Sequence, residues 1–136
     1  MSRAVNATLI VIGGMAGTAV RATLEAWFPA AVGQWPWATF WINISGSLLL
    51  GVLLETLAAF DDAGWRRSVR LGVGTGFFGG YTTYSSFSVE TVALLRGGDW
   101  LGGIGYAVFS VAIGILAALL AMLLVRRIRH AGQEAT

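Results

Sequence analysis

The feature that most constrains this chain is the length of its uncharged stretches. Four of them, of 17, 29, 19 and 26 residues, lie between the charged residues at 3 and 21, 25 and 55, 70 and 90, and 99 and 126. A helix needs about 20 mainly apolar residues to cross a bilayer. Only 12% of the residues are charged, whereas a soluble domain carries roughly 25%. The sequence therefore predicts an all-α integral membrane protein.

The charge gaps predict four transmembrane helices in a single domain covering residues 1–136. Their expected ranges are 4–27, 36–60, 66–97 and 99–127, followed by a polar tail at 128–136. The connections are short and contain the Pro, Gly and Asp residues that interrupt helices. The six tryptophans, which lie at 27, 35, 37, 41, 65 and 100, are close to the expected helix ends, as in the aromatic belt of a membrane protein.

Composition excludes several classes of function. The chain has no Cys, one His and no Lys, so disulfides, thiol chemistry, His-rich metal sites, Schiff bases and the P-loop are excluded. No nucleophile and base can be paired from these residues, and we expect no enzyme. The isoelectric point near 9.7 reflects few charges rather than many bases, so nucleic acid is not an expected partner.

Polar residues share one face of the expected second helix. Thr39, Asn43 and Ser47 are spaced by four, which places them in line. An amide in hydrocarbon costs about 2–7 kcal/mol unless it finds a partner. Asn43 therefore either joins helices, with Gly46 and Gly51 allowing close packing, or offers its N–H groups to a solute.

The expected third helix contains five glycines and then the run Thr82–Ser86. Glycine and hydroxyl residues weaken a helix, so a break is expected near 78–83. Broken backbone at membrane depth is tolerated inside protein or beside a water-filled cavity. Carbonyls freed there suit a hard cation, and freed N–H groups suit an anion. The alternative is a packing seam, since Gly72, Gly76 and Gly80 are spaced by four.

Two further sets of residues fit an anion path. Tyr84, Phe87 and Glu90 share a helical face, and the positive edges of aromatic rings can stabilise a small anion; the alternative is an ordinary aromatic core. In the last helix the stripe Tyr106, Ser110 and Gly114 offers hydrogen-bond donors. Arg21, with Glu25 four residues later, is either an interfacial ion pair or a positive charge that concentrates anions.

Four segments together resemble the CrcB/Fluc family of fluoride channels over nearly the whole chain. They are Gly13–Gly17 (GGMAG) with Arg21, Pro36–Asn43 (PWATFWIN) with Gly46, Gly76–Ser88 (GFFGGYTTYSSFS), and the pair Tyr106 and Ser110. The third segment is long and ordered, so it carries most of the specificity. The chain departs from the family pattern at four positions: Ala38 for Gly, Tyr84 for Phe, Ser86 for Thr, and Gly114 for a Ser of some members.

The resemblance implies passive export of cytoplasmic fluoride by an antiparallel, dual-topology dimer in the bacterial inner membrane. Two pores would lie at the dimer interface, with a structural sodium ion at the centre of the dimer, and membrane lipid would surround the protein. It implies backbone carbonyls of Gly79 and Thr82 as sodium ligands. It assigns the pore amide to Asn43, the aromatic box to Tyr84 and Phe87, the polar track to Thr83, Ser86, Tyr106 and Ser110, the vestibule to Arg21, and further polar positions to Thr39 and Glu90.

The distribution of arginine conflicts with a simple homodimer. With four spans, seven arginines fall on the side of both termini and two on the other, and such a bias orients a chain with the arginines in the cytoplasm. The chain is then either a homodimer subunit or one partner of an oppositely oriented paralogue. Two other functions remain open. One is a four-span proton-coupled drug or cation transporter, which needs a carboxylate deep in a span; the other is a structural subunit without transport.

Overall fold

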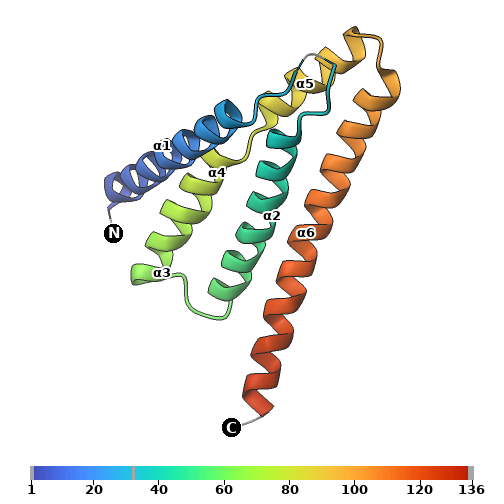
Figure 1. Cartoon of the computed structure of the whole chain (residues 1–136). Helices are drawn as coiled ribbons and strands as arrows, with labels where there is room; N and C mark the ends of the chain where they lie inside the picture. Colours follow the sequence, from blue (N-terminus) through green and yellow to red (C-terminus); the bar gives the residue numbers. More distant parts are fainter. Residues whose placement is uncertain (1, 32, 135–136) are drawn as a thin grey trace.

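The computed structural model describes residues 2–31 and 33–134, and every element within them is a helix (Figure 1). No strand occurs in these two ranges. The elements in chain order are α1 (Arg3–Trp27), α2 (Trp37–Leu57), α3 (Gly64–Val69), the π-helix η1 (Arg70–Phe77), α4 (Phe78–Tyr81), α5 (Tyr84–Arg96) and α6 (Trp100–Glu134).

Three of the helices, α1, α2 and α6, are each long and apolar enough to cross a membrane. The expected third helix, 66–97, is instead a series of shorter elements. α3, η1 and α4 follow one another without a gap from Gly64 to Tyr81, and α5 begins only at Tyr84. The π-helix was not predicted. It contains three glycines, and its widened hydrogen bonding shows in the Phe78 N–H, which donates to the carbonyl of Val73, five residues earlier.

Glycines bring α1 into direct backbone contact with η1 and α4. A Cβ atom added at Gly13 or Gly17 would overlap the carbonyl oxygens of Gly72 and Phe77. From the other side, a Cβ at Gly76 would lie 2.7 Å from the carbonyl oxygen of Ile10. The predicted packing seam of small residues is therefore confirmed, with α1 as its partner.

The other half of the subunit is built on α2, which packs along α6, while α5 packs across the first part of α6 (Figure 1). The core between them is small and consists of Phe40, Ile44, Leu94, Tyr106 and Ala117. Most large apolar side chains point outwards instead, as expected for a protein whose solvent is lipid. The three long apolar helices are those of a membrane protein.

The last helix is longer than predicted. α6 continues past the expected end at 127 to Glu134, so the polar tail is helical as far as it is described; residues 135–136 lie outside the described part. The Arg126 Nε and Arg129 Nη2 atoms lie 3.0 and 3.3 Å from the two carboxylate oxygens of Glu55, a side chain that is 4% exposed. Arg129 lies in the extra turns of α6, so its contact joins them to the end of α2.

Candidate functional site

The centre of the candidate site is the interruption between α4 and α5. α4 ends at Tyr81, Thr82 and Thr83 take extended conformations with ψ of 154° and 124°, and α5 begins at Tyr84. The interruption falls inside the predicted range of 78–83. The glycines and hydroxyl residues of this segment permit it, but its position is held by a contact from another helix.

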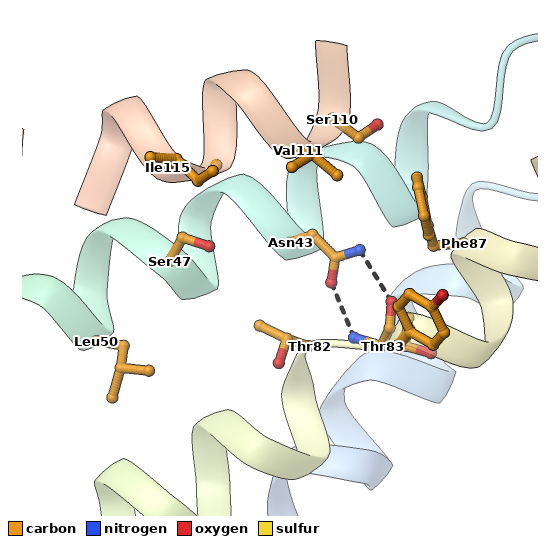
Figure 2. A pocket seen from close by; sticks show the side chains of 11 residues that line it. Asn43, Ser47, Leu50, Thr82, Thr83, Phe87, Ser110, Val111 and Ile115 are labelled. Atoms are coloured by element: carbon orange, nitrogen blue, oxygen red, sulfur yellow. Dashed lines mark hydrogen bonds between the residues drawn. The ribbon is translucent and has the colours of Figure 1, made fainter. Parts of the chain in front are cut away.

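That contact is made by Asn43 of α2. The Thr83 N–H donates to Asn43 Oδ1 at 2.8 Å, and Asn43 Nδ2 donates to the Thr83 carbonyl at 3.0 Å (Figure 2). The amide thus satisfies both backbone groups of one residue at the interruption. Asn43 joins helices, which is one of its two predicted roles, and its second amide N–H has no partner among the described residues.

The same contacts leave two carbonyls without their usual helical donors. In a continuous helix the Thr83 N–H would bond to the Gly79 carbonyl, but it bonds to Asn43. Likewise the Ser86 N–H, which would bond to the Thr82 carbonyl, donates to Thr83 Oγ1 at 3.1 Å and begins α5 as a side-chain cap. Gly79 and Thr82, the residues expected to bind sodium, therefore carry carbonyl oxygens that suit a hard cation.

Beside the interruption lies an open cavity of about 330 Å³ between α2, α5 and α6 (Figure 2). Five predicted pore residues line it, together with Thr82 of the predicted sodium site: Asn43, Thr83, Tyr84, Phe87 and Ser110. The remaining lining residues are Ser47, Leu50, Val111, Gly114 and Ile115. Ser47 and Gly114 stand in the two stripes noted in the sequence, whereas the three aliphatic residues gave no signal. None of the described lining residues carries a charge.

Ser110, which lines this cavity, has a hydroxyl without a hydrogen-bond partner in the part of the chain that the structure describes. The side chain is 6% exposed, and its Oγ has no hydrogen-bond partner among the described residues. A buried hydroxyl without a partner is unusual and costs about 1–3 kcal/mol. Such a group is explained when a solute completes its hydrogen bonding.

The aromatic residues form a row along one side of the site. The ring centroids of Tyr84 and Phe87 are 6.0 Å apart, and those of Phe87 and Tyr106 are 5.3 Å apart. Tyr84 is 81% exposed at the open side, whereas Tyr106 is fully buried. Tyr84 and Phe87 therefore share one face, as expected, with their rings tilted by 43°. Tyr106 packs against Phe87 from behind and does not line the cavity.

Three other predicted polar residues meet away from the cavity. Thr39 Oγ1 donates to Glu90 Oε1 at 2.7 Å, and the Tyr106 hydroxyl donates to Glu90 Oε2 at 2.8 Å. Glu90 thus connects α2, α5 and α6 with one donor on each oxygen. Ser86 also lies outside the lining, and its Oγ accepts from the Thr83 hydroxyl at 3.2 Å.

Arg21, the expected vestibule residue, does not line this cavity. Its Nε donates to the carbonyl of Gly80 at 3.2 Å, and its Nη1 pairs with Glu25 at 3.0 Å. The predicted ion pair with Glu25 is therefore present. The sequence gave no sign of the contact with Gly80, because the two residues are 59 positions apart.

A family model described as "CrcB-like protein, Camphor Resistance (CrcB)" matches residues 8–122. The chain belongs to the CrcB family. The relative "Fluoride-specific ion channel FluC 1" of Cutibacterium acnes is 42% identical over 125 residues, which cover 91% of this chain and 87% of the relative. "Fluoride-specific ion channel FluC 2" of Leifsonia xyli is 48% identical over 112 residues, or 82% and 77% of the two chains. "Fluoride-specific ion channel FluC" of Bordetella petrii is 38% identical over 112 residues, or 82% and 84%.

Proposed function

We propose that this CrcB protein is a subunit of a fluoride-selective channel that lets cytoplasmic fluoride leave the cell passively. The relatives named above are fluoride-specific ion channels, so the chain is placed among channels and not among enzymes. The observation that carries the proposal is the uncharged cavity, which brings Asn43, Phe87 and the unpartnered hydroxyl of Ser110 together.

The chemistry of this cavity suits a small, partly dehydrated anion. The second N–H of Asn43 and the hydroxyl of Ser110 are neutral donors, and the ring edges of Phe87 and Tyr84 carry partial positive charge. A full positive charge would hold fluoride tightly, whereas neutral donors replace lost water without preventing release. Thr83, Ser86 and Tyr106 supply further hydroxyl groups beside this path, and Thr39 and Glu90 continue the polar residues towards the end of the helices.

A second subunit completes the pore in this proposal. The cavity is open on one side, and Tyr84 is 81% exposed there, so a single subunit cannot enclose an ion path. An antiparallel dimer covers both open cavities and forms two pores at its interface. The carbonyls of Gly79 and Thr82 hold a structural sodium ion at the dimer centre, and the bound cation fixes the interrupted backbone, which we place near the middle of the membrane.

Orientation in the bacterial inner membrane decides which dimer forms. Ion pairs occupy Arg70, Arg126 and Arg129 at the end with more arginines, but acidic partners contribute little to the orientation rule. We propose an antiparallel homodimer, with an oppositely oriented paralogue as the alternative. Reporters fused to the C-terminus distinguish the two: both orientations support the homodimer, and a wholly cytoplasmic C-terminus supports the paralogue.

Fluoride efflux from liposomes containing the purified protein tests the function. We expect fluoride flux and no chloride flux, with strong loss of flux in Phe87→Ile and no change in Phe28→Ile, which alters an exposed phenylalanine outside the cavity. Absence of fluoride flux would remove the proposal. Proton-dependent dye efflux would support the drug or cation transporter instead, although both carboxylate oxygens of Glu55 and of Glu90 already have donors.

A further inference from the structure

The carbonyl of Gly80 is held from α1 by two donors. Arg21 Nε lies 3.2 Å from it and the Thr18 hydroxyl 3.4 Å. A carbonyl oxygen has two lone pairs, so both are used. Gly80 stands between Gly79 and Thr82, the two residues proposed to bind sodium, and its own oxygen is thereby withheld from a cation.

The guanidinium of Arg21 is itself held in place. Its Nη1 pairs with Glu25 one helical turn further along α1, and the Arg21 and Glu25 side chains are only 20% and 28% exposed. The planar guanidinium directs one edge to Gly80 and another to the carboxylate, a fixed geometry that a lysine cannot reproduce. The backbone below is equally constrained, because a Cβ at Gly80 would overlap the carbonyl oxygen of Gly14.

The position of Arg21 also fits the electrostatics of the helical segment from Gly64 to Tyr81. Gly80 lies in the last turn of that segment, where unpaired carbonyls make the helix end negative and a cationic side chain is stabilising. Arg21 therefore satisfies one carbonyl of this turn, while the next turn cannot form because of the contact between Asn43 and Thr83.

We infer that Arg21 is a positioning residue: oriented by Glu25, it clamps the Gly80 carbonyl and so fixes the neighbouring carbonyls of Gly79 and Thr82 in the arrangement that binds sodium. The inference takes the sodium ion from the proposed function, but it does not depend on a fluoride pore. This role is different from the vestibule role expected from the sequence. The inference also predicts the direction in which sodium affinity changes when Arg21 is replaced. If Arg21 acted only as a nearby positive charge, its removal would strengthen sodium binding. If Arg21 is a clamp, its removal weakens sodium binding.

The test measures sodium binding on the purified full-length protein in its native assembly. Thermal unfolding is followed as sodium replaces a bulky organic cation, because a ligand of the folded state raises the unfolding temperature. In Arg21→Gln the sodium concentration for half-maximal stabilisation should rise about tenfold or more, which corresponds to about 1.4 kcal/mol. Arg21→Lys should lie between this variant and wild type, and Arg96→Gln, which removes another arginine, should match wild type.

Two milder variants keep the inference testable if Arg21→Gln does not fold. Thr18→Val removes the second donor and Glu25→Gln removes the ion pair, and each should raise the required sodium concentration about threefold. Unchanged or tighter sodium binding in the Arg21 variant, or in both milder variants, would overturn the clamp, and so would a wild-type protein that sodium does not stabilise. Fluoride flux is measured separately on the same preparations. Absence of flux would refute the proposed channel, whereas the sodium measurements would still test the clamp.

Discussion

The contact between Asn43 and Thr83 gives the sharpest prediction about stability. Asn43→Ala removes both hydrogen bonds, of 2.8 and 3.0 Å, that join α2 to the interrupted segment. Thr83 is 8% exposed, so its backbone N–H and carbonyl lose their partners in a nearly buried position. The substitution therefore tests whether this amide holds the interruption in place.

The size of the effect follows from those two groups. A buried polar group left without a partner costs about 1–3 kcal/mol, so two of them cost about 2–6 kcal/mol. The adjoining cavity lets water reach one of them, which favours the lower half of that range, about 2–4 kcal/mol. At roughly 4 °C per kcal/mol for a chain of this size, the unfolding temperature should fall by about 8–16 °C.

The assay is thermal unfolding of the purified protein in detergent, followed by tryptophan fluorescence. Thr56→Ala is the matched control, because Thr56 is also on α2 but its hydroxyl bonds only to the Val52 carbonyl of its own helix. We expect the control to stay within about 0.5 kcal/mol of wild type. Equal unfolding temperatures for Asn43→Ala and Thr56→Ala would refute the reasoning, since the interruption would then persist without the amide.

Three further substitutions address the rest of the subunit. Gly17→Ala forces α1 away from η1 and should lower the unfolding free energy by about 1–3 kcal/mol, whereas Gly14→Ala, whose Cβ meets its nearest atom at 3.8 Å, should be neutral in the same denaturation assay. Glu55→Gln should loosen the end of α6, seen as faster amide hydrogen exchange after residue 126, by about 1–2 kcal/mol because its arginine partners are partly exposed. The hydrogen bond from Arg70 lowers the pKa of Asp62 from 3.8, so the stability from this pair is present above pH 3.8 and is lost as the pH falls through the lowered pKa. An NMR titration should show that pKa return towards 3.8 in Arg70→Gln, and an unchanged pKa would contradict the pairing.

Local sequence patterns predicted the long helices because the length of an uncharged stretch indicates whether the segment lies in lipid or in water. Long uncharged stretches stay out of water wherever they fold, so α1, α2 and α6 followed from the charge gaps. The interruption was equally local, since Gly79-Gly80 followed by hydroxyl residues weakens any helix. The charge gaps ended the last helix at 127, whereas α6 continues to Glu134 and pairs through Arg126 and Arg129 with Glu55, far away in the sequence.

Residue spacing also placed polar side chains on common faces, and the family resemblance named a set of them as pore residues. Asn43, Thr83, Tyr84, Phe87 and Ser110 do line one cavity. Spacing did not show which residues only stand behind it. Tyr106 shares a stripe with Ser110, yet it is fully buried against Phe87 and bonded to Glu90.

By itself, then, the sequence determined that this protein lies in a membrane, where its three long helices run, where another helix is weak, and which polar residues share a helix face. Only the tertiary structure decided what holds the break: Asn43 from 40 residues away and Arg21 from 59 residues away. The physical reason is the sequence separation over which each property acts. Hydrophobic length and helix weakness are properties of neighbouring residues, whereas the partner of a buried donor depends on how closely separate helices approach, and here the glycines of α1, η1 and α4 set that distance.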